Sequence, residues 1–205
     1  MNFLTILPLA FVMIAGPQLL SAIFLATSED WRRTSIAYIA GAALSITLFV
    51  TLAYLLLNGA SDQGASNDSL YAVVLVLLLA AMLRTFLKRR EATVPKWMQK
   101  LQTATPRFAF TLGAALLGVF PTDILTSAAV GSYLAAHGDP LWHMLPFLGL
   151  TLLFLAIPSL MIVALGQRAH VILPKVREWM TTHSWVVNEV VLAFFVLITI
   201  DSLAG

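Results

Sequence analysis

Two short strings of the sequence carry the polar residues best placed for chemistry. Each begins with a proline, and amide, hydroxyl or carboxyl side chains follow at spacings that put them on one face of a helix. The candidate binding residues are Pro17, Gln18, Ser21, Pro121, Thr122, Asp123, Thr126 and Ser127. Side chains of this kind suit the binding of a polar cargo, a proton or an ion.

Asp123 stands in a stretch that is otherwise free of charge, residues 108–136. An ionised carboxylate near the middle of a bilayer costs about 2.5–3.5 kcal/mol even on lenient scales. Such a residue lines a cavity, pairs with a partner or stays protonated. One interpretation is that Asp123 binds cargo or carries a proton. The other is that Asp123 has a purely structural role, in a hydrogen-bonded cluster with Thr122, Thr126 or Gln18.

The composition of the chain points to a membrane protein. Of its 205 residues, 60% are hydrophobic and 11% are charged, against about 25% charged in a typical soluble protein. There are no cysteines, which excludes disulfides and Cys-ligated zinc. The four histidines are not at metal-ligand spacing, and neither a phosphate-binding loop nor a nucleophile elbow is present. We therefore expect no cofactor, no metal and no enzymatic activity.

Long apolar stretches recur along the chain and account for most of it. They cover residues 3–27, 34–57, 70–87, 108–136, 141–166 and 186–205. A helix needs roughly 20 apolar residues to cross a bilayer, and its backbone groups must pair within the segment. The sequence therefore predicts an all-α integral membrane protein with six transmembrane helices.

The basic residues predict how these helices are oriented. All 12 Lys and Arg residues lie in or beside the first, third and fifth connections. By the positive-inside rule these connections are cytoplasmic, so both termini face outward. The sequence pI near 9.2 then reflects membrane topology, and we expect no nucleic-acid partner.

The predicted helices fall into two halves of opposite orientation. Residues 1–87 form one three-helix repeat, residues 108–205 form the other, and residues 88–107 form a basic, amphipathic cytoplasmic linker. Pro17 and Pro121 lie at matching depths in the two leading helices. A proline inside a helix removes a donor and opens the backbone, so we expect both helices to break near the membrane midplane, with the breaks facing each other. Inverted repeats with such broken helices are typical of secondary transporters.

Two further patterns concern packing and the membrane surface. Ala37, Gly41 and Ser45 recur every four positions, which permits close helix contact, and Gly131 suits the same role. Around Pro174, the apolar residues Ile172, Val176 and Trp179 alternate with Lys175 and Arg177. That segment can lie at the inner membrane surface, either to recruit lipid or as a simple anchor.

Three strings resemble a known family of membrane proteins. They are GPQLLSAIFLAT at residues 16–27, GVFPTD at residues 118–123 and VGSYLAAHGDPLW at residues 130–142. They look like the GAP family, the glycopeptidolipid- or sulfolipid-addressing proteins, within the lysine-exporter superfamily. The resemblance implies a multi-pass protein of the prokaryotic cytoplasmic membrane that is linked to the export of glycolipids or small molecules.

These observations lead to one prediction of function and one alternative. The prediction is an exporter of a small molecule or glycolipid that works by alternating access, coupled to protons or cations. The alternative is a non-transporting accessory protein of a lipid export or synthesis complex. The expected partners are membrane lipids and the cargo, together with a second copy of the chain in a homodimer.

Overall fold

The computed structural model describes residues 3–14, 16–58, 101 and 103–183. The chain divides into two compact units, Met1–Ser61 with Pro95–Arg177 and Asp62–Val94 with Glu178–Gly205. The predicted helices at residues 70–87 and 186–205, and most of the predicted linker at residues 88–107, lie outside the described residues.

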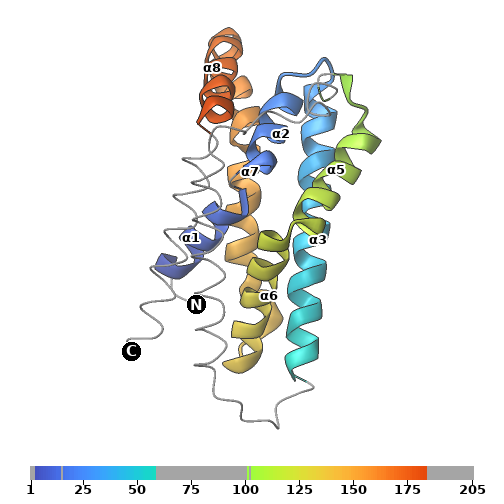
Figure 1. The fold of residues 1–205 in the computed structure, drawn as a ribbon, viewed down its shortest axis with the longest axis vertical. Helices are drawn as coiled ribbons and strands as arrows, with labels where there is room; N and C mark the ends of the chain where they lie inside the picture. The colour runs from blue at the N-terminus through green and yellow to red at the C-terminus, as the bar shows by residue number, and fades with distance from the viewer. Residues whose placement is uncertain (1–2, 15, 59–100, 102, 184–205) are drawn as a thin grey trace. The chain divides into compact units, whose positions relative to one another are not determined.

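The described part of the chain is helical and contains no strand (Figure 1). Its α-helices are α1 (Phe3–Ile14), α2 (Pro17–Ala26), α3 (Trp31–Asn58), α5 (Pro106–Val119), α6 (Pro121–Ala136), α7 (Leu145–Leu165) and α8 (Ala169–Thr182). Two short 3-10 helices, η2 (Leu141–Met144) and η3 (Gly166–Arg168), flank α7. The all-α prediction is confirmed for these residues.

Several of these helices are long and apolar enough to cross a membrane. Trp31–Leu56 and Leu141–Arg168 each qualify alone, and α5 with α6 makes a third span if the bent pair counts as one. The chain is therefore a multi-pass membrane protein. The prediction of six spans is not tested by the described residues, since α1 and α2 are each shorter than a bilayer crossing.

Helix α3 shows why these helices suit lipid. Its outward side carries large apolar residues: Ile36, Leu44, Leu48, Leu52, Leu55 and Leu56. Its buried side includes the polar residues Ser35, Tyr38 and Ser45. A helix in water buries its apolar face, whereas lipid tails solvate leucine as well as a protein interior does. The polar and small residues of α3 are thus left to contact other helices.

Glycines bring the backbone of α3 against α5 and α6. A Cβ atom added to Gly41 would lie against the carbonyl oxygen of Phe110, and one added to Gly113 would lie against the carbonyl oxygen of Tyr38. Gly131 of α6 meets the backbone of α3 in the same way at Val50. The predicted packing role of Gly41 and Gly131 is confirmed, and α5 and α6 lie one after the other along α3 (Figure 1).

These contacts also give the helix directions. Residues 38–45 of α3 meet residues 110–118 of α5, and Val50 and Tyr54 meet Gly131 of α6, so the broken helix α5–α6 runs parallel to α3. Helix α2 ends at Ala26 and α3 begins at Trp31 after a short turn, so α1–α2 runs in the opposite direction (Figure 1). The two proline-containing helices are therefore antiparallel.

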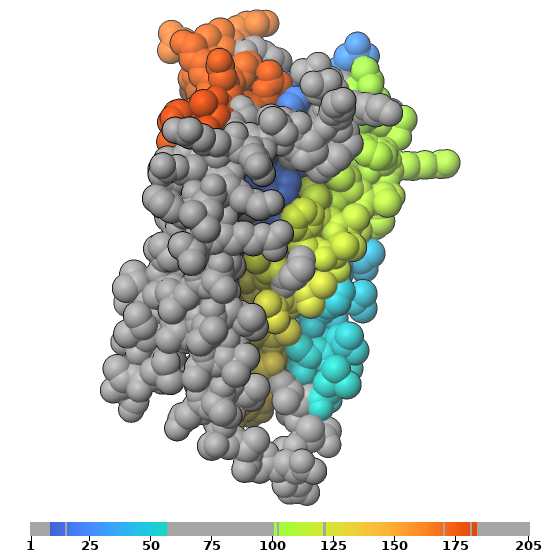
Figure 2. All heavy atoms as spheres, in the orientation of Figure 1, coloured from blue at the N-terminus to red at the C-terminus, as the bar shows by residue number. Residues whose placement is uncertain are grey.

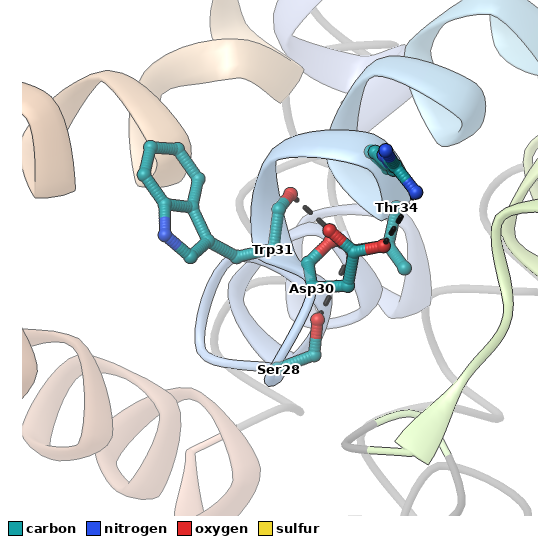
Figure 3. A network of polar contacts seen from close by, with 5 residues as sticks. Ser28, Asp30, Trp31 and Thr34 are labelled. Atoms are coloured by element: carbon teal, nitrogen blue, oxygen red, sulfur yellow. Dashed lines mark hydrogen bonds and ion pairs between the residues drawn. The ribbon is translucent and has the colours of Figure 1, made fainter.

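The turn from α2 to α3 is closed by a polar cluster (Figure 3). The Ser28 hydroxyl donates to the carbonyl oxygen of Leu25 at 2.7 Å and lies 3.0 Å from the Thr34 hydroxyl. Thr34 Oγ1 in turn lies 3.0 Å from the carbonyl oxygen of Asp30. Both hydroxyls are buried. Since both hydroxyls donate to the Leu25 carbonyl oxygen, which the end of α2 leaves without an intrahelical partner, the cluster fixes where α2 ends and α3 begins.

The basic residues of the described part gather at one end of the first unit. They lie at the start of α3, at the start of α5, at the end of α7 and in α8, which share one end of the bundle (Figure 1). These residues are Arg32, Arg33, Arg107, Arg168, Lys175 and Arg177. The opposite end, at the end of α6, carries His137 and Asp139.

The glycine contacts predict a large effect of one methyl group. Gly41→Ala places a Cβ closer than 3.0 Å to the backbone of α5, so α3 and α5 must separate, and we expect a loss of about 1–3 kcal/mol of stability. The measurement is unfolding of the purified protein in detergent. Gly149→Ala in α7 is the control, because nothing lies within 4 Å of its added Cβ. Equal stability of the two variants would contradict the close contact.

Candidate binding site at the helix breaks

The first break separates α1 from α2 at Gly16 and Pro17. Gly16 has φ 97° and ψ −135°, a conformation that is essentially restricted to glycine. Pro17 follows as the first residue of α2, where its missing N–H would have had no intrahelical partner. The carbonyl oxygen of Gly16 accepts from the Leu20 amide at 3.3 Å. The dipeptide thus ends one helix and begins the next.

The second break lies between α5 and α6 at Phe120 and Pro121. Phe120 has φ −69° and ψ 126°, the extended conformation that a following proline imposes. Pro121 is the first residue of α6, and the axes of α5 and α6 differ by 69°. Irregular backbone at both prolines was predicted from the sequence, and the structure confirms it at both positions.

A hydrogen bond connects the two breaks. The side-chain amide of Gln18 donates to Asp123 Oδ2 at 2.6 Å, across 105 positions of sequence. Gln18 is 2% exposed and Asp123 is 1% exposed. The Thr122 hydroxyl donates to the other carboxylate oxygen, Oδ1, at 3.4 Å. The two breaks were predicted to face each other, and this hydrogen bond between their side chains confirms it.

The geometry around this bond favours negative charge. Gln18 lies in the first turn of α2, and Asp123 lies in the first turn of α6. Both helices thus point their N-termini, which carry a partial positive charge, at the same place. In the part of the chain that the structure describes, no cationic side chain pairs with Asp123. The helix ends and two neutral donors stabilise its carboxylate there.

The other predicted site residues lie close to the breaks but differ in their contacts. Thr126 is buried, and its hydroxyl donates within α6 to the carbonyl oxygen of Thr122 at 2.8 Å. Ser127 is buried beside α1, with its hydroxyl 4.0 Å from Met13 Sδ. Thr122 is exposed. Asp123 and Ser127 thus reach the other broken helix, whereas Thr126 bonds to its own.

Two oxygen atoms at the first break are buried and have hydrogen-bonding capacity to spare. Gln18 Oε1 and Ser21 Oγ have no hydrogen-bond partner among the described residues. Buried polar atoms without partners cost about 1–3 kcal/mol each, so such atoms commonly mark a place where water or a ligand binds. They give α2 two buried oxygen atoms that can accept a hydrogen bond.

Tyr38 belongs to the site and was missed in the sequence analysis. Its hydroxyl donates to the carbonyl oxygen of Gln18 at 2.9 Å, and its side chain is fully buried. Tyr38 thereby connects α3 to the first turn of α2, next to the helix break. A signal was available: Tyr38 lies three positions before Gly41, on the close-packed side of its helix, and a buried tyrosine hydroxyl requires a partner.

Comparison with known proteins identifies the family. The family model described as Sap, sulfolipid-1-addressing protein, matches residues 6–202. The chain belongs to this family. The match covers both helix breaks and confirms the resemblance to the GAP family that the three sequence strings indicate. No curated protein and no solved structure matches the chain.

The contact between the breaks in this sulfolipid-1-addressing family member predicts energetic coupling. Gln18→Ala and Asp123→Ala should each destabilise the protein, and the double variant should lose less than the sum of both, with a coupling of about 0.5–3 kcal/mol. The measurement is unfolding of all four proteins in detergent. Pairing Gln18→Ala with Thr111→Ala is the control, because Thr111 is exposed and bonds within α5. Additive effects in both pairs would contradict a direct interaction.

Proposed function

We propose that the protein exports lipid across the cytoplasmic membrane by alternating access, with sulfolipids the first cargo class to test. The observation that carries this proposal is the meeting of two antiparallel broken helices at the Gln18–Asp123 bond. Broken helices that present their N-termini to one buried place are a recurring design of transporter binding sites. The family name supplies the cargo class, since it refers to the addressing of a sulfolipid.

The packing suggests which parts move in this cycle. Backbone contacts at Gly41 and Gly113 bind α3 tightly to α5, and such contacts have little freedom to slide. Helix α2, in contrast, meets Asp123 of α6 through a side chain. We infer that α3, α5 and α6 form a rigid part, and that α1 and α2 move against it. A change at the Gln18–Asp123 bond would then open or close the site.

Asp123 is the group that we propose couples transport to a cation or proton. Its carboxylate lies among neutral donors and helix N-termini, so binding a proton or cation changes the charge of the site by a full unit. That change alters the bond to Gln18, which acts between the two broken helices. In the alternative, purely structural role, Asp123 makes the same bond to Gln18, but neither its charge nor this bond changes during transport.

The alternative is an accessory protein that assists a separate exporter or a lipid-synthesis enzyme. The word addressing in the family description fits either role. Both proposals retain a multi-pass protein without enzymatic activity that acts with membrane lipids and assembles as a homodimer. The transporter is favoured here because an accessory protein has no need for a buried carboxylate between two opened helices.

A flux measurement tests the transporter proposal. Liposomes that contain this protein alone should move a labelled sulfolipid between leaflets under an imposed proton or cation gradient. Flux that appears only after other membrane proteins are added would favour the accessory role. Recovery of the lipid with altered mass would instead indicate an enzyme.

Asp123→Asn separates the two roles of the carboxylate within that assay. The amide retains the size of the side chain and an acceptor for Gln18, but it removes the titratable charge. We therefore expect a folded protein whose gradient-driven flux falls at least about tenfold, as expected when a buried functional carboxylate is lost. Thr111→Ala serves as the control and should keep full flux. Wild-type flux in a folded Asp123→Asn protein would remove Asp123 from the mechanism while leaving export itself intact.

The proposed orientation predicts which residues an impermeant reagent reaches. Because the chain lacks cysteine, single substitutions report cleanly. Cysteine at His137, an exposed residue at the end of α6, should react from outside intact cells. Cysteine at Gln167, an exposed residue at the basic end, should react only after permeabilisation. The reverse pattern would invert the orientation.

A further inference from the structure

Helix α8 begins where a membrane span ends. The candidate span Leu141–Arg168 is followed directly by Ala169, the first residue of α8. Between the end of α7 at Leu165 and the start of α8, the chain turns at Gly166, which has a φ of 51°, a conformation favoured by glycine. In Figure 1, α8 lies at the end of α7 that carries the basic residues. Helix α8 therefore starts at the edge of the apolar layer.

The two sides of α8 differ in what they contact. Ala169 and Leu173 are buried. Val171, Ile172 and Val176 are 59%, 38% and 39% exposed, and Lys175 is exposed among them. At about 100° per residue, Lys175 lies between Val171 and Ile172 around the helix. We call these four exposed residues, Val171, Ile172, Lys175 and Val176, the α8 face.

The orientation of α8 is fixed by an arginine on another side of the helix. The Arg177 guanidinium lies 4.6 Å from the centre of the Phe24 ring on α2, a distance that permits a cation–π interaction. Arg177 is about 160° from Lys175 around the helix at about 100° per residue. The contact with Phe24 therefore keeps the α8 face turned away from α2, and Figure 2 shows α8 at the surface.

The charge around α8 is predominantly positive. This end of the described structure carries the bases Arg32, Arg33, Arg107, Arg168, Lys175 and Arg177. Its acids are Glu29, Asp30 and Glu178, and Asp30 lies 4.0 Å from Arg33. Lys175 is the charged residue within the α8 face, and Arg168 precedes it by two turns. Apolar side chains beside Lys and Arg match an interface between acyl chains and anionic headgroups.

We propose that the α8 face binds the anionic surface of the lipid bilayer. Val171, Ile172 and Val176 enter the layer just below the headgroups, and the aliphatic stem of Lys175 lies along them while its ammonium group reaches a headgroup phosphate. The partner is bulk anionic phospholipid, so this role is independent of the proposed cargo and of transport.

A fluorescent label at Ile172→Cys tests the proposal in the full-length, otherwise cysteine-free protein. The labelled protein is placed in nanodiscs of phosphatidylcholine, to which phosphatidylglycerol is added in steps. The label should shift its emission to shorter wavelength and be quenched by lipids with a nitroxide near the headgroup as phosphatidylglycerol increases. Lys175→Gln should weaken the apparent affinity for phosphatidylglycerol about fivefold, since each base near an anionic surface contributes about 1 kcal/mol.

A label at Leu153→Cys, which is exposed near the middle of the span that contains α7, is the matched control and should be quenched by lipids with a nitroxide on the acyl chain at every composition. An equal signal from Ile172 in neutral and anionic nanodiscs would overturn the proposal, as would an unchanged response in Lys175→Gln. Shielding of the Ile172 label from both lipid and aqueous quenchers would also overturn it, because a protein surface would then cover the α8 face.

Discussion

Backbone groups within a bilayer have no water to bind, so a helix that opens there must be enclosed by protein or by a polar cavity. This protein opens two helices, at Gly16–Pro17 and at Phe120–Pro121. The bond from Gln18 to Asp123 joins them, and the Tyr38 hydroxyl binds the carbonyl oxygen of Gln18. These two bonds connect α2, α3 and α6 next to the breaks.

The enclosure depends on helices that approach very closely. Gly41 and Gly113 let the backbones of α3 and α5 touch, and Gly131 does the same for α6. In lipid there is little hydrophobic gain from bringing two apolar helices together, so small residues that permit backbone contact become the main source of specificity. The leucines of α3 accordingly face outward, while Ser35, Tyr38 and Ser45 face inward.

The same arrangement gives the site its electrostatic character. Because α1–α2 and α5–α6 are antiparallel, the N-termini of α2 and α6 converge, and their partial positive charges surround Asp123. A buried polar site thus lies within an apolar bundle. It consists of the Asp123 carboxyl group, the two helix ends, and the Gln18 and Ser21 oxygen atoms that have no hydrogen-bond partner among the described residues. The description of the sulfolipid-1-addressing family, to which the chain belongs, refers to a lipid.

Much of this was determined by the sequence alone. Helical spans follow from uninterrupted apolar stretches, breaks follow from prolines that lack an amide hydrogen, and the family follows from the strings around them. These are local properties, so Pro17, Pro121 and Asp123 were identifiable without a fold. The pairing of Gln18 with Asp123, the role of Tyr38 and the contact of Ser127 with Met13 were decided by tertiary structure. Each depends on how separate helices are rotated and spaced against one another. The four-residue spacing around Gly41 predicts close packing, but it does not show which backbone this glycine meets, and that contact sets the rotation and spacing of the helices.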